Sequence, residues 1–224
     1  MYPKSLIKHM DAAAIWQQFV DNIRNTGPLE YIAVVTGIGS VWFSRLENIW
    51  VYPVGLVSTT IYIYLSLIQS LPGEALVNVF YTVMSIYGWI LWARKNRQQE
   101  HVVVIRASNK PELLQQFLFF AVIFVTLFSA LTWLKTGFSP NVIPWADSLA
   151  SATAFTGMLL MAKKKVESWH WWIATNICSI PLYFVKGYAL SSVFYFILFI
   201  MAIAGLIEWK RRAAGNNTPI PTDR

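Results

Sequence analysis

Long apolar stretches, separated by short polar connections, dominate this chain. Seven of them approach the roughly 20 residues that a helix needs to cross a hydrocarbon core of about 30 Å. None carries Lys, Arg, Asp or Glu near its middle. The predicted helices cover residues 31–44, 50–71, 75–92, 113–134, 145–162, 169–185 and 190–207. We therefore expect an all-α integral membrane protein with seven transmembrane helices.

The two ends of the chain differ from this transmembrane domain, which we place at residues 29–212. Within the N-terminal segment 1–28, the stretch 12–25 places its apolar side chains on one helical face. This pattern predicts an amphipathic helix that lies on the membrane surface or packs against the bundle. Residues 213–224 are polar and form a predicted cytoplasmic tail.

Composition supports a membrane protein and the charges orient it. Of the 224 residues, 56% are hydrophobic and 13% charged, against the roughly 25% charged residues of soluble domains. The net charge of +7 comes from basic residues between the apolar stretches, which argues against nucleic-acid binding. Five basic residues fall on the face of the N-terminus and 13 on the other face. The positive-inside rule then predicts an outside N-terminus and a cytoplasmic C-terminus.

A sequence repeat suggests how the helices are organised. The motif G-x-x-x-W-x-R-(K/R) begins at Gly88 and again at Gly205, 117 residues later. A looser match aligns Trp50 with Trp169 at an offset of 119 residues. These matches predict two triple-helix copies, 29–95 and 145–212, joined by a connecting helix at 112–134. Because the connector restores the direction, the copies run parallel, as in transporters that bind substrate between two repeats.

The chemistry of the predicted helices argues against catalysis and ion coupling. The three histidines show no metal-ligand spacing, and the sequence has no Gly-rich phosphate loop. The single cysteine, Cys178, can form no internal disulfide. Ion-driven pumps usually carry ionisable groups within the membrane. Their absence here favours a facilitator, with no catalytic residue, metal or cofactor.

Neutral polar and aromatic side chains are the candidates for binding a substrate. Single Ser, Thr and Tyr residues are more simply explained by bonds between helices, worth around 0.6 kcal/mol each. Asn78 and Asn176 stand out because a buried amide is costly unless it is paired. Trp172 shares a helix face with Asn176, and Tyr183 lies about three turns farther on. Pro181 predicts a kink or a hinge. Rings and amides together suit a flat, polar heterocycle.

Two blocks of sequence resemble the PnuC family of nicotinamide riboside transporters. One is WHWWIATNICSIPLYFVKG at 169–187, and the other is FYTVMSIYGWILW at 80–92. The similarity extends over about residues 29–212. The W-x-x-W feature of the family falls on Trp169 and Trp172, and its sixth-helix amide falls on Asn176. Where the family often has Gln in the third helix, this chain has Asn78.

This resemblance implies a fold similar to the SWEET sugar transporters, in a three-plus-one-plus-three arrangement, assembled as a homotrimer in the bacterial inner membrane. It also implies facilitated diffusion of nicotinamide riboside, a form of vitamin B3 and precursor of NAD. A cytoplasmic riboside kinase would then retain the substrate by phosphorylation. Related transporters carry thiamine or riboflavin on the same scaffold, so another vitamin is the alternative substrate.

We therefore predict a pocket lined by aromatic and amide side chains. The predicted substrate-binding residues are Trp50, Tyr62, Asn78, Tyr81, Trp169, Trp172, Asn176, Tyr183 and Tyr195. Two other classes of protein give different expectations. A membrane-embedded enzyme requires a nucleophile or an acid/base pair in the helices, and none is found there. A structural protein without a ligand would not depend on Trp172 or Asn176 for ligand-induced stabilisation.

Overall fold

A computed structural model describes residues 16–17, 20, 23–24, 26–68, 72–99, 101–135, 142–186 and 188–216. Within these residues the chain forms seven helices, and each of the seven predicted stretches falls on one of them. They are α2 (Pro28–Arg45), α3 (Val51–Ile68), α4 (Pro72–Ala93), α5 (Lys110–Lys135), α6 (Pro144–Ala162), α7 (Ser168–Val185) and α8 (Ala189–Asn216). The expectation of an all-helical chain is confirmed. The predicted amphipathic helix at 12–25 lies mostly outside the described residues.

Several helix ends differ from the prediction for simple physical reasons. α2 begins three residues early, at Pro28, because proline suits the first turn of a helix, where its missing N–H needs no partner. α8 continues nine residues past the predicted end, to Asn216. Glu208 there pairs with Arg211 at 2.8 Å and with Arg212 at 2.9 Å. Such pairs, three and four residues apart, support a helix after the apolar stretch has ended.

Four of the described helices are long and apolar enough to cross a membrane, namely α3, α5 and most of α4 and α8. The other three, α2, α6 and α7, carry more small and polar residues. In α6 these residues face the interior, because Ser148, Thr153, Thr156 and Gly157 are all buried. Their polarity therefore reflects packing inside the bundle. The chain is a multi-helix membrane protein, and the number of seven crossings remains a prediction.

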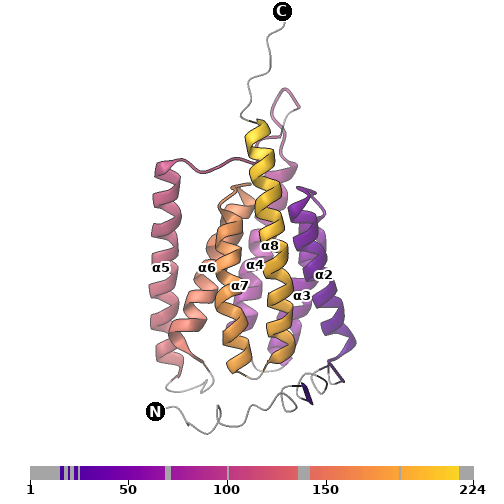
Figure 1. Cartoon of the computed structure of the whole chain (residues 1–224), viewed down its shortest axis with the longest axis vertical. Helices are drawn as coiled ribbons and strands as arrows, with labels where there is room; N and C mark the ends of the chain where they lie inside the picture. Colours follow the sequence, from indigo (N-terminus) through magenta and orange to yellow (C-terminus); the bar gives the residue numbers. More distant parts are fainter. Residues whose placement is uncertain are drawn as a thin grey trace, which may run out of the picture.

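Six helices form a closed ring, and α5 lies outside it (Figure 1). α3 packs between α2 and α4, and α7 packs between α6 and α8. Contacts of α2 with α8 and of α4 with α6 close the ring. α5 packs mainly on α6, and its Phe117 and Phe120 also meet the Trp171 ring of α7. Successive helices alternate in direction, so α2, α4, α6 and α8 finish at the same end. We call α2–α4 the first half and α6–α8 the second half.

The two halves make matching ring-on-glycine contacts. The ring of Tyr52 lies so close to Gly88 that a Cβ atom on the glycine would meet it at 2.5 Å. The ring of Trp169 lies equally close to Gly205, again at 2.5 Å. Both residues of the second pair follow those of the first by 117 positions. These contacts match Tyr52, and not Trp50, with Trp169, and so favour the offset of 117 over that of 119.

The tryptophan of the repeated motif also has a matching role in each half. The Trp92 indole donates a hydrogen bond to the carbonyl of Ala162, at the end of α6, at 3.1 Å. The Trp209 indole donates to the carbonyl of Ser44, near the end of α2, also at 3.1 Å. Carbonyls at the end of a helix lack a partner within that helix. Each indole therefore caps the first helix of the opposite half.

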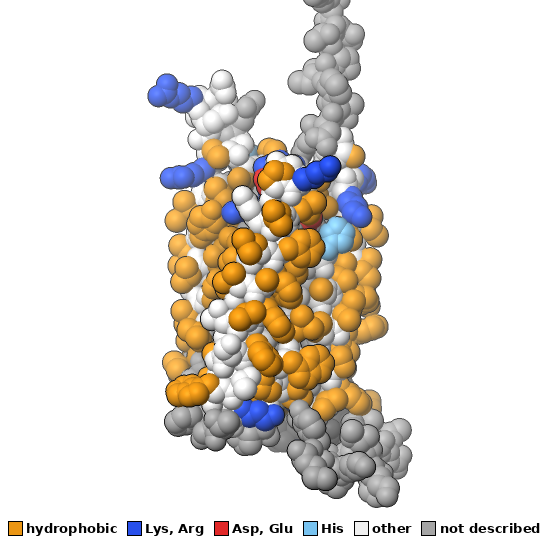
Figure 2. Space-filling model, turned by 90° about the vertical axis from the view of Figure 1, so that its left-hand side faces the viewer, with side chains coloured by type: hydrophobic (Ala, Val, Ile, Leu, Met, Phe, Trp, Pro, Cys, Tyr) orange, Lys and Arg blue, Asp and Glu red, His pale blue; other side chains and the backbone are white. Residues whose placement is uncertain are grey.

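The main core cluster lies where α2, α4, α6 and α8 finish, and most described Lys and Arg residues gather at this end as well. Figure 2 shows these cations beyond a broad apolar belt. We call it the basic end. The buried residues of the cluster come from both halves and from the connection before α5: Val51, Tyr52, Trp92, Ile105, Met161, Val166, Trp169, Ala202, Trp209 and Ala213. At the basic end the two halves are therefore packed directly together.

Candidate substrate site

Aromatic rings from both halves meet where α4, α6 and α7 come together. Tyr81 of α4 lies with its ring centroid 6.4 Å from that of Trp172 of α7. Phe155 of α6 is 6.1 Å from Tyr81 in an edge-on contact. Phe155 also stacks on Phe80 at 4.0 Å. Because Trp172 and Tyr81 come from different halves, a ligand held between them would contact both halves.

The amide of Asn176 lies one helical turn from Trp172 and is the most informative polar group in this region. Asn176 is only 2% exposed. Within the described part of the chain its side chain makes no hydrogen bond. The adjacent Thr175, by contrast, bonds Thr153 at 3.0 Å and the Trp171 carbonyl at 2.9 Å. Buried polar groups nearly always have a partner, so the Asn176 amide is suited to bind a ligand.

A second ring pair extends the site along α7 and α8. Tyr183 stacks on Tyr195 with centroids 5.0 Å apart and an interplanar angle of 25°. Tyr81, of the ring contacts described above, lies on α4. The sequence places these three tyrosines on three different helices. Among the predicted residues, the structure thus brings Tyr81 against Trp172, places Asn176 one turn from Trp172, and stacks Tyr183 on Tyr195.

The remaining predicted residues lie in other environments. Trp169 is 1% exposed and belongs to the core cluster at the basic end, where it meets Trp209 edge-on at 5.6 Å. Trp50 is 58% exposed on the connection before α3. Tyr62 and Asn78 are half-buried, on α3 and α4. These four positions are not part of the ring contacts described above.

Phe155 and Gly157 also belong to this candidate site, and neither was predicted from the sequence. The Trp172 indole lies over Gly157, where a Cβ atom would meet ring carbons at 3.3 Å. The position 117 residues before Gly157 is Ser40, and the position 117 residues before Trp172 is Gly55. There the glycine takes the place of the indole, and a Cβ atom on Gly55 would meet the Ser40 hydroxyl oxygen at 2.9 Å. The repeat offset was thus the signal that would have identified Gly157. Only the second half carries an indole at this position.

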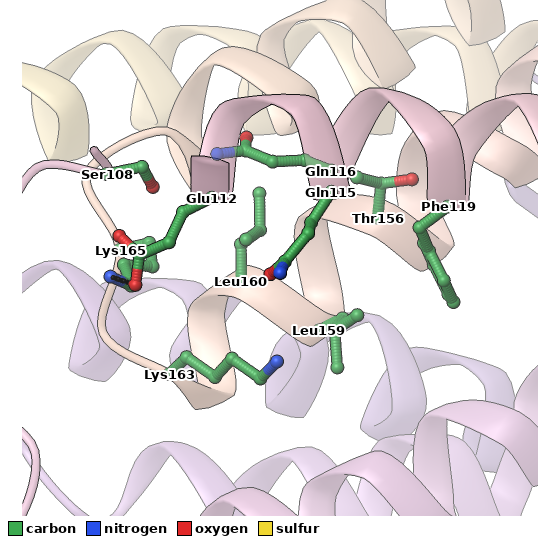
Figure 3. Close-up of a pocket in the computed structure, with 10 residues that line it drawn as sticks. All are labelled: Ser108, Glu112, Gln115, Gln116, Phe119, Thr156, Leu159, Leu160, Lys163 and Lys165. Atoms are coloured by element: carbon green, nitrogen blue, oxygen red, sulfur yellow. Dashed lines mark hydrogen bonds and ion pairs between the residues drawn. The ribbon is translucent and has the colours of Figure 1, made fainter. Parts of the chain in front are cut away.

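A separate small pocket of about 80 Å³ lies between α5 and α6 at the basic end (Figure 3). Lys165 pairs there with Glu112 at 2.6 Å. Burial lowers the pKa of Lys165, against the opposing effect of Glu112. Gln116 accepts a hydrogen bond from the Trp171 indole at 3.1 Å. Drug-sized ligands need roughly 300 Å³ or more, and none of the predicted site residues lines this pocket.

The ring cluster offers binding rather than catalysis. Aromatic faces stack on flat rings and attract a ring cation, and an amide supplies both a donor and an acceptor. Over the described residues, no group of three His, Cys, Asp or Glu side chains is arranged to hold a metal ion. The arrangement therefore suits a flat ligand that carries a hydrogen-bonding group.

Comparison with known protein families agrees with this picture. Residues 27–211 match the model of a family described as the nicotinamide mononucleotide transporter. The chain belongs to this family. Its members are transporters, so this protein is a multi-pass membrane transporter and not an enzyme. The resemblance to PnuC proteins noted in the sequence is confirmed at the level of the family.

Individual members of the transporter family differ in their named substrates. The nicotinamide riboside transporter PnuC of Escherichia coli is 26% identical over 201 residues, which cover 81% of this chain and 84% of the relative. The riboflavin/roseoflavin transporter RibM of Streptomyces davaonensis is also 26% identical, over 94% of this chain and 92% of its own. Sequence identity alone therefore does not separate these substrates.

A solved structure shows the same fold. The crystal structure of the vitamin B3 transporter PnuC superposes with a TM-score of 0.69 and covers 96% of this chain and 94% of the solved one. The two are 22% identical. At that identity the likeness concerns the fold of this transporter, and its substrate must be argued from the site.

Proposed function

We propose that this transporter carries nicotinamide riboside across the bacterial inner membrane. The observation on which this rests is the unpartnered, buried amide of Asn176 beside the rings of Trp172 and Tyr81. The riboside consists of a flat pyridinium ring, which bears a carboxamide, and a ribose. Its cationic ring would lie between the aromatic faces, and its carboxamide would form a reciprocal pair of hydrogen bonds with the Asn176 amide. Tyr183 and Tyr195 would then lie on the side of the ribose.

The alternative substrate is another flat vitamin, with riboflavin favoured over thiamine by the similarity to RibM. Riboflavin also has a planar ring with amide-like groups. It is uncharged, however, so it would gain less from the aromatic faces than a pyridinium does. The two readings therefore differ in how strongly binding depends on the positive charge of the ligand.

Uptake of radiolabelled nicotinamide riboside into proteoliposomes tests the substrate. We expect uptake that excess unlabelled riboside abolishes and that equal excesses of riboflavin or thiamine reduce by less than about twofold. We also expect no change when a protonophore is added, because the middles of the described helices carry no Lys, Arg, Asp, Glu or His. Strong riboflavin uptake without riboside uptake would reverse the assignment. Collapse of uptake with the proton gradient would contradict facilitated diffusion.

The architecture proposed with this function is a SWEET-like pair of parallel repeats. The repeats would be residues 29–95 and 145–212, joined by the connecting helix within 112–134. The ring-on-glycine contacts at an offset of 117 residues support this division, as do the two indoles, 117 residues apart, that cap the opposite half. The N-terminus would lie outside and the C-terminus, with the tail 213–224, in the cytoplasm, which agrees with the cations at the basic end.

The proposal also includes the assembly of the transporter and the retention of its substrate in the cell. We expect a homotrimer, which the mass of the protein in nanodiscs would test. α5 supports an assembly because it lies outside the ring of six helices and exposes Phe117, Leu118 and Val125 to its surroundings. A cytoplasmic kinase that phosphorylates the riboside would keep the transport gradient directed inward, since the transporter itself supplies no energy.

Gly157→Ala is expected to weaken riboside binding about three- to tenfold without unfolding the protein. The new methyl would meet the Trp172 indole at 3.3 Å, so the ring must shift by a few tenths of an ångström. Alanine is the better helix former by about 1 kcal/mol, which offsets the strain on stability. Binding is measured by isothermal titration. Gly39→Ala serves as control, because its Cβ would make an ordinary 3.5 Å contact with Val54. Equal affinities in both variants would refute a role for Gly157 in positioning Trp172.

A further inference from the structure

Two side-chain contacts at the basic end join residues that are themselves 117 positions apart. The Ser44 hydroxyl lies 2.9 Å from the Met161 sulfur. The Lys164 ammonium lies 2.7 Å from a carboxylate oxygen of Glu47. When two halves are related by a twofold rotation, a residue can contact its own counterpart only on the axis of that rotation. Both contacts therefore lie on the axis between the halves.

Glu47 and Lys164 occupy matching and unusual backbone positions. Each follows the first helix of its half, and each has a left-handed backbone, with φ of 59° at Glu47 and 51° at Lys164. This conformation is uncommon for residues other than glycine. The Lys164 side chain is 5% exposed, and its ammonium lies 4.6 Å over the Trp92 ring. The turns thus aim one acidic and one basic side chain at each other across the axis.

Further contacts tie the same carboxylate to the second half. Arg212 of α8 reaches the other oxygen of Glu47 at 3.2 Å. At the opposite end, the ion pair between Asp147 and Lys186 lies within the second half. Among the described residues, ion pairs that connect the two halves therefore occur only at the basic end. Separation of the halves there would break them, whereas separation at the other end would not.

We propose that the ion pair of Glu47 and Lys164 is the latch that holds the basic end of the transport pathway closed. Opening this end moves the halves apart at the axis, so it must break a contact made across that axis. The pair lies at the same end as the Ser44–Met161 contact and the core cluster, to which Met161 and Ile105 belong. This inference rests on the proposed pathway between the halves, but not on the identity of the substrate.

The accessibility of a cysteine beside the latch tests this proposal in the full-length protein. In a Cys178→Ser background, Ser44→Cys places the sole thiol on the axis, where the native side chain is 3% exposed. We expect slow reaction with a maleimide in detergent. Glu47→Gln, Lys164→Met and the double variant should each raise the labelling rate at least about tenfold, since loss of an ion pair between the halves favours the open state. The double variant removes both charges, so neither Glu47 nor Lys164 remains as an unpaired charge.

Two controls separate a latch from general loosening of the fold. Arg106→Gln removes a charge at the same end whose partner is Glu112, and it should leave the labelling rate of Ser44→Cys unchanged. Ser192→Cys reports on the opposite end, where the native side chain is 7% exposed. Its labelling should not rise in the latch variants. An unchanged rate at position 44, or a parallel rise at position 192, would overturn the proposal. Because no substrate is present, the result stands apart from the uptake assays.

Discussion

Gly205→Ala is expected to lower the melting temperature of the purified protein by about 5–10 °C, the equivalent of about 3 kcal/mol. A Cβ atom at this position would lie 2.5 Å from the indole of Trp169, far inside contact distance. The indole has little room to move, because Trp169 is 1% exposed and meets Trp209 edge-on. The added methyl must therefore displace the core of the basic end. Thermal unfolding followed by the loss of monodisperse protein measures the effect.

Gly215→Ala is the matched control for this prediction. It makes the same change in the same helix, at a position where a Cβ atom would meet nothing within 4 Å. We expect equal or slightly higher stability there, since alanine favours the helix. Trp169→Phe removes part of the ring that the new methyl would strike, so it should recover part of the loss when combined with Gly205→Ala. Equal melting temperatures for the two glycine variants would refute the close packing.

Asn176→Leu is expected to abolish most riboside binding, with an affinity loss of about 100-fold, and to leave the fold equally stable or more stable. Removal of a hydrogen-bonding partner from a ligand group that remains buried costs about 1–3 kcal/mol, and more when two bonds are lost. The amide has no partner within the described chain, so its loss leaves no protein group unsatisfied. Leucine has a similar volume. Titration calorimetry and thermal unfolding measure the two effects.

A variant of Thr175, the neighbour of Asn176, should show the opposite pattern of effects. Thr175→Val removes a hydroxyl that bonds Thr153 and the backbone of Trp171. This variant should lose about 1 kcal/mol of stability and retain its affinity for the riboside. An Asn176→Leu protein that unfolds more readily, with unchanged affinity, would show that the amide supports the fold and does not bind the substrate.

The helices could be predicted because each depends on its own composition. α3 and α5 are long and apolar enough to cross a membrane, and their positions follow from that composition. The ends could not be predicted equally well. Glu208 extends α8 through pairs with arginines one turn away, and this stabilisation appears in the sequence only as a polar stretch. Helix ends are decided by a few local interactions, which a hydropathy pattern does not record.

The site could be predicted only in part, because ring contacts between helices depend on register. Trp172 and Asn176 could be placed on one helix face from the sequence, because they are four residues apart. Phe155 is an ordinary apolar residue of α6, and only its stacking on Phe80 assigns it to the site. Trp50 has the composition of a binding residue, but it lies on an exposed connection. Residue type narrows the candidates, and the packing of the helices selects among them.

The opposite charges of Glu47 and Lys164 also bear on how such a chain can have arisen. If the first half paired with a second copy of itself, two Glu47 carboxylates would meet on the axis. If the second half did so, two Lys164 ammonium groups would meet there. Like charges in contact are strongly unfavourable when shielded from water. The two halves are therefore not interchangeable at this position. An ancestral half-length protein that assembled as a symmetric dimer would have needed an uncharged residue at this position.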